Sequence, residues 1–418
     1  MTMKAGALVA QGAYGCILSP AIPCANKTET IPGLKIRGTM GNEFTRTVLE
    51  TRKHKSSPSQ EHPHSVSKVF DSKAEMKTEW SMAQRIAKLD PAQKYFVYAT
   101  DKCEVTRAAV LRSQASNHAS DNQSCDILMK NYKTDIFPSV RMPNGGLPMH
   151  RWLAKRKGTI DLVELVKLFM PVFNALQLLN KAGLVHQDMK ANNILIDTGY
   201  ASYKNPRARI IDFGLMTQAA NLFDSKQNSM AYSPYWLLPP EYRVRRWIRN
   251  HPENAIPGKQ AKNQKHNTNP KLSDMDIQNL VIQETDHLNR KFSGTHDIEW
   301  LKSIYNMFWP SQCERETNIR HLADRITKAA SAEAALKRYT ARVDIYGLGL
   351  IMMWASQYTT VFVQHAHSGP GISNEPRIPE WADFRDIIRA MTSADPSKRA
   401  TVKKAQGMVR AFVGKYGR

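Results

Sequence analysis

The sequence predicts an α+β fold in two lobes or domains, on the evidence of its length and of its strand and helix patterns. Its 418 residues exceed the length of an average domain and can bury a sizeable core. Short runs of β-branched and aliphatic residues, separated by turn residues, concentrate in the first third of the chain. Helical periodicity dominates the remainder. A hydrophobic content of 42% is ordinary for a globular protein.

The balance of charge is unusual, with a formal net charge of +22 and a pI near 9.8. Such an excess indicates an anionic partner or environment, such as nucleic acid, an acidic protein or a membrane surface. The alternative is a solvated basic surface around an enzyme that binds a polyanionic nucleotide. Net charge does not specify the fold.

The cysteines predict a reducing compartment, because their number is odd, they are scattered and no CxxC pair occurs. They are Cys16, Cys24, Cys103, Cys125 and Cys313. We therefore expect free thiols, with neither a zinc site nor a disulfide framework. The first residues lack a long apolar segment with a cleavage site, and no run approaches about 20 apolar residues. We expect neither a signal peptide nor a transmembrane segment.

Residues 7–18, ALVAQGAYGCIL, predict two strands joined by a turn that carries Gly12 and Gly15. Glycines there let backbone N–H groups approach phosphates closely, although hairpin glycines are also common without any ligand. Residues 26–65 are polar and predict a long insertion without catalytic content. The alternating SVSKVF at 65–70 predicts a strand that carries Lys68; an edge-strand surface lysine is the alternative.

A helix is predicted over 73–89, where apolar residues recur at helical spacing until Asp90 and Pro91 end the pattern. Glu79 shares a face with Ala83 and Ile86, whereas Glu75 lies one turn earlier. Short strands are predicted at 94–100, 125–132 and 135–142, with a Ser/Asn-rich loop near 113–124. Two helices follow, near 147–157 and 160–181, and the second is strongly apolar.

The segment 184–197, LVHQDMKANNILID, predicts a polar loop between two short buried strands. The loop places Asp188, Lys190 and Asn193 close together in sequence. Strands on both sides can hold such side chains in one arrangement. Phosphoryl transfer needs a carboxylate for the attacking hydroxyl, a cation for the phosphate and an amide oxygen for a metal. Alone, the segment also fits a polar turn.

Later motifs decide between these interpretations. Residues 208–215, ARIIDFGL, place Asp212 after an apolar run, and LLPPEY follows with Glu241. RVDIYGLGLIMMW at 342–354 contains Asp344, and DPSKRAT at 395–401 contains Arg399. In this order, the motifs resemble those of a eukaryotic-type serine/threonine protein kinase, whose catalytic loop reads H-R-D-x-K-x-x-N. The resemblance implies the bilobal protein-kinase fold, with an N-lobe at 1–142, a hinge at 143–146 and a C-lobe at 147–418.

The resemblance also implies a role for each matching residue. Asp188 would orient the substrate hydroxyl and Lys190 would face the γ-phosphate of ATP. Asn193 and Asp212 would hold Mg²⁺, with Mn²⁺ as an alternative. ATP would be bound by three parts of the chain: the glycine turn, the lysine with its glutamate, and the hinge. The residues are Gly12, Gly15, Lys68, Glu79, Met142 and Asn144. Glu75 is the alternative partner of Lys68. Glu241, Asp344 and Arg399 would be structural.

Three positions depart from the family pattern: Pro239 replaces the Ala of A-P-E, Ala10 replaces the first glycine of G-x-G-x-x-G, and Gln187 replaces the usual Arg of the catalytic loop. That Arg pairs with an activation-loop phosphate in many kinases. GAYGCILSPAIPC, LDPAQKYFVY and the long insertion after PPE are similar to kinases of large nucleocytoplasmic DNA viruses. This implies an intracellular enzyme of host cytoplasm or virion, not secreted, that acts on viral structural or host proteins. The alternative is a catalytically silent kinase fold with a structural or DNA-associated role in the virion; a lipid or small-molecule kinase fits less well.

A second insertion is predicted at 243–340, basic at first and then helical from 274. Its first residues interleave arginines with Trp247, a pattern that can contact nucleic acid or acidic protein. The arginines are Arg243, Arg245, Arg246 and Arg249. A solvated helix face is the alternative.

Overall fold

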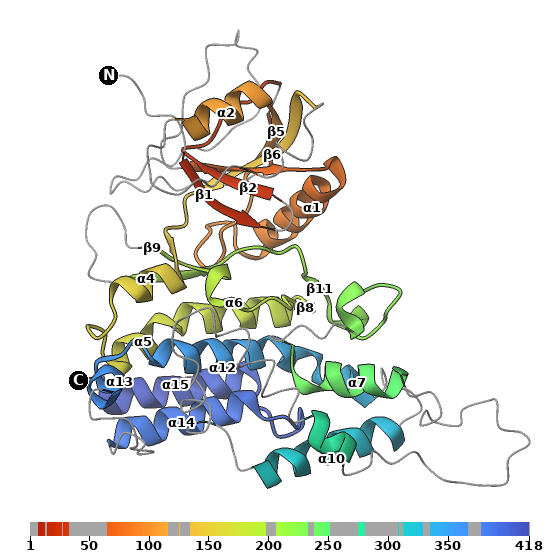
Figure 1. Ribbon diagram of the computed structural model, residues 1–418, viewed down its shortest axis with the longest axis vertical. Coiled ribbons are helices and arrows are strands. Elements are labelled where there is room, and N and C mark those ends of the chain that lie inside the picture. Colours follow the sequence, from red (N-terminus) through yellow and green to blue (C-terminus); the bar gives the residue numbers. More distant parts are fainter. Residues whose placement is uncertain are drawn as a thin grey trace, which may run out of the picture. The chain divides into compact units, whose positions relative to one another are not determined.

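A computed structural model describes residues 7–12, 15–26, 28–32, 65–115, 125, 134–197, 206–232, 238–250, 275–280, 308, 312–328, 335–366 and 378–417. The chain forms two compact units, Met1–Leu147 with Leu195–Gly214, and Pro148–Ile194 with Leu215–Arg418. Strands dominate the first unit and helices the second (Figure 1). The predicted α+β class is confirmed. Most of the insertion predicted at 26–65 lies outside the described residues.

The first unit is built on an antiparallel sheet with strand order β1-β2-β4-β6-β5-β3. Its strands are β1 (Ala7–Gly12), β2 (Gly15–Ser19), β3 (Glu29–Thr30), β4 (Ser65–Phe70), β5 (Asp101–Thr106) and β6 (Ile136–Pro143). Gly12 pairs with Gly15 at the turn between β1 and β2, as predicted. Lys68 lies in β4 between Ile17 of β2 and Val140 of β6, so it is in the interior of the sheet rather than on an edge strand.

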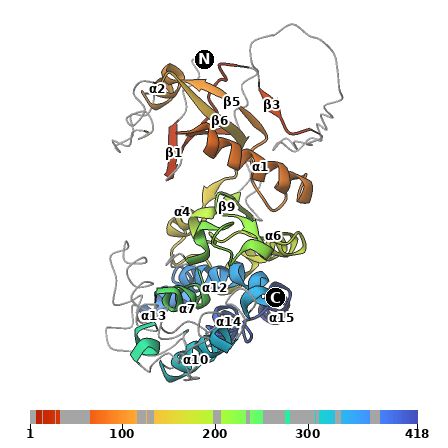
Figure 2. The same ribbon diagram turned by 90° about the vertical axis from the view of Figure 1, so that its right-hand side faces the viewer.

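Helix α1 (Lys73–Leu89) has the predicted bounds and packs against β4 and β6 (Figure 2). Ser72 caps its first turn, because the hydroxyl accepts a hydrogen bond from the Glu75 N–H at 3.2 Å. The helix buries Trp80, Ala83 and Ile86. Since Glu79 shares a face with Ala83 and Ile86, the apolar pattern that fixes the helix also directs Glu79 towards the sheet.

The strand predicted at 94–100 is wrong, because Asp90 turns the chain. Its carboxylate accepts hydrogen bonds from the N–H groups of Lys94, Tyr95 and Phe96 at 2.9, 2.7 and 3.0 Å. These N–H groups are then not available to a sheet ladder, and Phe96 forms only an isolated parallel bridge with Ile210. Helix α2 (Arg107–Ala115) replaces the start of the predicted loop. The strand predicted at 125–132 lies outside the described residues except for Cys125.

The prediction of free thiols is also wrong, because the first unit contains two disulfides. Cys16 is bonded to Cys125 and Cys24 to Cys103. Their Cα atoms are 5.9 and 5.8 Å apart, within the normal range for a disulfide. Scattered positions in the sequence misled the prediction, since the sheet brings together cysteines that are 109 and 79 residues apart.

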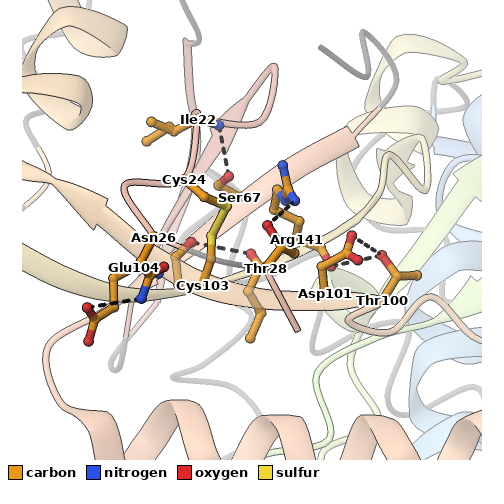
Figure 3. Close-up of a disulfide and its surroundings, with 12 residues drawn as sticks. Ile22, Cys24, Asn26, Thr28, Ser67, Thr100, Asp101, Cys103, Glu104 and Arg141 are labelled. Atoms are coloured by element: carbon orange, nitrogen blue, oxygen red, sulfur yellow. Dashed lines mark hydrogen bonds between the residues drawn. A yellow bond between two sulfur atoms is a disulfide. The ribbon is translucent and has the colours of Figure 1, made fainter. Parts of the chain in front are cut away.

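Hydrogen bonds flank the Cys24–Cys103 disulfide and fix the segment after β2 along β5 (Figure 3). Asn26 and Glu104 exchange two of them: Asn26 Nδ2 donates to Glu104 Oε2 at 3.2 Å, and the Glu104 N–H donates to Asn26 Oδ1 at 2.8 Å. The Ile22 N–H donates to Ser67 Oγ at 2.9 Å. The disulfide therefore adds a covalent link between segments that backbone hydrogen bonds also join, since the Ala25 N–H donates to the Glu104 carbonyl at 2.7 Å.

We expect loss of both disulfides to destabilise the first unit. A closed loop of this length contributes about 2–4 kcal/mol per bond, because it restricts the unfolded chain. Cys24→Ser should lower the free energy of unfolding accordingly, whereas Cys313→Ser, at a cysteine that neither bond includes, is the matched control. Urea unfolding with and without reductant measures the effect. Complete alkylation of Cys16 and Cys24 in the unreduced, denatured protein would contradict the assignment.

The second unit is largely a stack of helices. These are α4 (Met149–Lys155), α5 (Leu162–Leu168), α6 (Met170–Lys181), α7 (Pro240–Asn250), α10 (Gln312–Lys328), α12 (Val343–Ser356), α13 (Thr360–Ala366), α14 (Pro379–Thr392) and α15 (Val402–Tyr416). Helix α12 is almost wholly buried. Gly349 allows α14 to approach it, since a Cβ there would lie 2.6 Å from Thr392 Cγ2. The single helix predicted over 160–181 is divided at Phe169, where Pro171 lacks the N–H that would continue the ladder.

Short elements connect these helices: β7 (Leu147–Pro148), β8 (Leu184–Val185), η1 (Ala191–Asn193), β9 (Ile194–Asp197), β10 (Arg207–Ile210), β11 (Thr217–Gln218), η2 (Ala219–Asn221), η3 (Ser229–Tyr232) and η5 (Lys337–Arg342). The strands predicted on either side of the polar loop are confirmed as β8 and β9. Among the described residues, the stretch Leu162–Lys181 is long and apolar enough to cross a membrane. Because a buried core helix has the same properties and over half of this one is buried, the indication is weak.

The basic segment at 243–249 is not the exposed patch that the sequence suggested. Arg243 and Arg245 are 8% and 2% exposed. Arg243 donates to the Leu238 carbonyl at 3.4 Å, and Arg245 donates to the Ala231 carbonyl at 3.0 Å. Arg246 and Arg249 are exposed. Two of the four guanidinium groups therefore serve packing inside the unit, and the predicted four-arginine surface for nucleic acid or acidic protein does not form.

Helix α10, in the second insertion, is an integral part of the second unit. It packs against α7, and its Ile319 and Leu322 join a buried apolar cluster with Tyr242. Arg325 donates to Tyr339 Oη at 3.0 Å and to Asp395 Oδ1 at 3.1 Å. The insertion thus braces the segment that carries Arg399.

Candidate active site

The polar loop between β8 and β9 brings two predicted catalytic side chains and a predicted metal ligand together. Lys190 Nζ donates to Asp188 Oδ2 at 2.7 Å, and Asn193 Nδ2 donates to the same oxygen at 2.8 Å. Asn193 Nδ2 also donates to the Asp188 carbonyl at 3.0 Å, which closes the loop on itself. Asp188 is 4% exposed, so these bonds form where water screens them little. The carboxylate is held by a cation and an amide at one position.

The Asp344 carboxylate of α12 holds the backbone at the start of this loop. Its Oδ2 and Oδ1 accept hydrogen bonds from the N–H groups of His186 and Gln187 at 2.8 and 2.9 Å. Burial raises the pKa of Asp344, and its electrostatic interaction with His186 and the two N–H donors oppose that rise. The predicted structural role of Asp344 therefore has a direct physical basis: a buried carboxylate orients the backbone immediately before Asp188.

Two predicted motifs adopt a left-handed backbone, which costs energy for residues other than glycine. Gln187 has φ 64° and Asp212 has φ 65°. Among the described residues, the other position of this kind without glycine is Gln93. Such conformations persist where surrounding contacts impose them, and they cluster at functional sites. Both motif positions are consistent with that rule.

In the first unit, Lys68 of β4 forms an ion pair with Glu79 of α1. Its Nζ also lies 4.0 Å from Asp212 Oδ1. Burial acts to lower the pKa of Lys68, but the Glu79 and Asp212 carboxylates outweigh it and raise that pKa. Lys68 therefore remains a cation. Glu79, rather than Glu75, is the partner that the structure places on the lysine.

Asp212 lies at the end of the segment that returns to the first unit. Phe213 beside it is buried, with its ring 5.9 Å from that of Phe96 in an edge-on arrangement. The Asp212 side chain is 40% exposed, which leaves it accessible to a ligand. Packing of Phe213 thus fixes the backbone beside a carboxylate that lies near Lys68 and stays partly exposed.

The predicted hinge residues end β6 and form a tight turn. Met142 is buried in β6, and Asn144 Oδ1 accepts a hydrogen bond from the Gly146 N–H at 3.0 Å. Gly146 has φ +99°, and a Cβ there would collide with the Ile196 carbonyl. Contacts of Met142 and Asn144 with adenine, like the phosphate role of Gly12 and Gly15, stay predictions.

The predicted structural pair is fully formed in the second unit. Arg399 makes two parallel hydrogen bonds to the Glu241 carboxylate, both at 2.8 Å, and both side chains are fully buried. Such a bidentate pair is the geometry that Arg favours with carboxylates. It joins the first turn of α7 to the segment before α15.

The candidate metal ligands have the donor chemistry of a hard cation. Asp212 supplies a carboxylate and Asn193 an amide oxygen, which Mg²⁺ prefers over nitrogen and sulfur ligands. Within the described part of the chain, no cluster of three or more His, Cys, Asp or Glu side chains is placed to hold a metal ion by itself. Mg²⁺ usually binds one or two carboxylates together with substrate phosphates, so the donor type of each residue, taken singly, fits Mg²⁺ bound with a nucleotide.

The sequence did not reveal the groups that surround Gln187. Gln187 Nε2 donates to the Leu215 carbonyl at 2.6 Å, and Asn228 Nδ2 donates to Gln187 Oε1 at 2.9 Å. Asn228 stands in the polar run DSKQN, where nothing distinguishes it from its neighbours. Tertiary contacts alone identify it.

Comparisons with known proteins identify a related domain. Residues 131–246 match the family model for the protein kinase domain. A 90-residue segment is 30% identical to the mitogen-activated protein kinase kinase kinase MCK1 of Pyricularia oryzae and covers 21% of this chain and 6% of that protein. A 130-residue segment is 28% identical to the hormonally up-regulated neu tumor-associated kinase of Mus musculus, covering 30% of this chain and 17% of that protein. The chain thus matches less than a fifth of either relative, and the similarities support a protein kinase of eukaryotic type.

Proposed function

We propose that this chain, which carries a protein kinase domain in residues 131–246, is an ATP- and Mg²⁺-dependent serine/threonine protein kinase. The observation that carries the proposal is the convergence of Lys190 and Asn193 on the Asp188 carboxylate. The first unit separately contributes the Lys68–Glu79 ion pair and Asp212, so the chain contains each kind of group that phosphoryl transfer requires.

In the proposed reaction, a substrate hydroxyl oxygen attacks the γ-phosphorus of ATP and the bond to the bridging oxygen of ADP breaks. Asp188 orients the hydroxyl and accepts its proton, while Lys190 offsets charge on the transferred phosphoryl group. Lys68 holds the α- and β-phosphates, and its raised pKa keeps it charged. Mg²⁺, held by Asn193 and Asp212, would neutralise phosphate charge. No covalent enzyme intermediate is needed, since positioning and charge stabilisation provide the catalysis.

Protein hydroxyls are the proposed acceptors, because Lys190 follows Asp188 by two residues, the pattern that resembles serine/threonine kinases. We also propose an intracellular viral enzyme of host cytoplasm or virion that acts on viral structural or host proteins. The two disulfides favour the virion, since disulfides persist at virion surfaces and are rare in the cytosol.

The acceptor class can be tested by phosphoamino-acid analysis. The purified chain is incubated with γ-labelled ATP, Mg²⁺ and generic basic and acidic proteins, and the labelled protein is hydrolysed. We expect label on phosphoserine and phosphothreonine. Label mainly on phosphotyrosine would contradict the serine/threonine proposal while leaving the kinase assignment intact.

Replacing Asp212 by Asn should abolish the Mg²⁺ dependence of nucleotide binding, because it removes a charge from the proposed metal ligands. Asn tolerates the left-handed backbone that Asp212 adopts at φ 65°, so the fold should be retained. Titration of a fluorescent ATP analogue with Mg²⁺ or with EDTA measures the effect. Asp101→Asn, in β5 of the same unit, is the control. An unchanged Mg²⁺ response in D212N would count against the assignment.

A further inference from the structure

The side-chain amide of Gln187 is a junction between the catalytic loop and the chain that follows Gly214. Its Nε2 donates to the Leu215 carbonyl at 2.6 Å. Its Oε1 accepts hydrogen bonds from Asn228 Nδ2 at 2.9 Å and from Tyr242 Oη at 3.4 Å. Gln187 is 2% exposed, and its backbone N–H is already bonded to Asp344. The residue that precedes Asp188 thus contacts three separate parts of the second unit.

Asn228 extends this junction along the segment 215–230. Its Nδ2 also donates to the Leu222 carbonyl at 2.7 Å, and its Oδ1 accepts a hydrogen bond from the Met230 N–H at 3.0 Å. Asn228 is 6% exposed. One buried amide therefore closes the segment on itself and joins it to Gln187. Removing this amide by substitution would leave its buried partners without a hydrogen bond, so the closed form of the segment depends on it.

Helix α7 also contacts the segment 215–230, through the Phe223 ring. The Tyr242 ring lies 5.2 Å from that of Phe223, and the Arg245 guanidinium lies 5.7 Å from the Phe223 ring. Burial raises the pKa of Tyr242 well above its usual value, so the phenol remains a donor to Gln187 at physiological pH. The three groups that bond the Gln187 side-chain amide are all neutral: a backbone carbonyl, a side-chain amide and a phenol.

From this geometry we infer that Asn228 is a positioning residue for the proposed phosphotransfer: its buried amide, acting through Gln187, holds the segment 215–230 against the catalytic loop without a phosphate. A phosphate carries a charge of about −2 and needs cationic partners, which neutral amides do not provide. Phosphorylation of Thr217, Ser225, Ser229 or Ser233 should therefore not be required for activity; Ser233 lies outside the described residues. The expected effect on phosphotransfer rests on the proposed function, whereas the role of Asn228 in holding the segment 215–230 does not.

The first test is a double-mutant cycle on Gln187 and Asn228. N228D keeps the size of the side chain but removes both Nδ2 donors, and Q187M, of similar length, removes the Gln187 amide, including the oxygen that accepts the Asn228 bond. We expect each to lower kcat by about 10- to 100-fold, with the KM for ATP nearly unchanged, and the double variant to lose less than the product. Gln227→Glu is the control, an exposed amide of the same segment. Loss of activity that is equal in N228D and Q227E, or full additivity in the double variant, would overturn the inference.

The second test does not depend on activity. Limited proteolysis and hydrogen exchange of the intact chain should show faster opening of 215–230 in N228D than in the parent or Q227E. If the parent transfers no phosphate, the proposed function fails, and this measurement still decides the inference. Equal protection in N228D and the parent would contradict it.

The third test addresses the phosphate directly. The four hydroxyl residues are replaced by Ala, singly and together, and the parent is treated with phosphatase before assay. Activity should stay within a few-fold of the untreated parent. A loss of more than about 100-fold in kcat/KM, restored by an acidic replacement at one site, would show that a phosphate orders the segment and would overturn the inference.

Discussion

Asp188→Ala is expected to lower phosphotransfer by about 100- to 10,000-fold, the range that a general base contributes. The affinity for ATP should stay within a few-fold, because Asp188 is proposed to contact the substrate hydroxyl and not the nucleotide. Steady-state transfer to a protein substrate and equilibrium binding of a fluorescent ATP analogue measure the two effects. The separation of transfer from binding is the signature of this residue.

Two further variants make the Asp188 result interpretable. Asp188→Asn retains the side-chain volume beside Lys190 and Asn193, and so separates the loss of charge from the loss of packing. Asp383→Ala changes an aspartate of α14 that bonds Lys415 and should retain normal transfer. Transfer at the parental rate by purified D188A would rule out the proposed mechanism.

Arg399→Met should destabilise the second unit by about 3–5 kcal/mol, because it leaves the Glu241 carboxylate buried without its partner. Both side chains of this pair are fully buried, so water cannot compensate. Glu241→Leu combined with Arg399→Met should recover much of the loss, since an apolar pair of similar volume removes the isolated charge. Urea unfolding of the single and double variants provides the measurement.

The Arg156–Glu164 pair supplies the matched control, with an N–O distance of 3.0 Å and side chains about one-third exposed. Arg156→Met should cost less than about 1 kcal/mol, as for other solvent-exposed pairs. If R399M and R156M had similar costs, the Glu241–Arg399 pair would not have its proposed structural importance.

The sequence predicted the elements in which local pattern and tertiary packing agree. Helix α1 has its predicted bounds because its apolar face, its Ser72 cap and the Asp90-Pro91 stop act together. The strands around Asp188 and the burial of α12 followed from dense apolar runs. Glu79 was preferred over Glu75 because it shares a face with buried Ala83 and Ile86, and the structure places Glu79 on Lys68.

Predictions failed where distant parts of the chain decide the outcome. Cys16 meets Cys125 only after the sheet has formed, and their spacing in sequence carries no trace of this pairing. Arg245 stands in an arginine-rich segment that is typical of a solvated or anion-binding surface. Contacts with the Phe223 ring and the Ala231 carbonyl nevertheless hold its side chain in the interior. Asn228 was missed for the same reason. Arg245 and Asn228 lie in polar runs, where periodicity gives no signal.

Transfer of the terminal phosphate is the most direct test of the central claim. The purified chain is incubated with Mg²⁺, generic basic and acidic proteins, and ATP labelled at either the γ- or the α-phosphate, with D188A in parallel. We expect label on the protein substrate from γ-labelled ATP only, and almost none with D188A. Nucleotide binding by the parent without any transfer from γ-labelled ATP would contradict this account and favour a catalytically silent kinase fold.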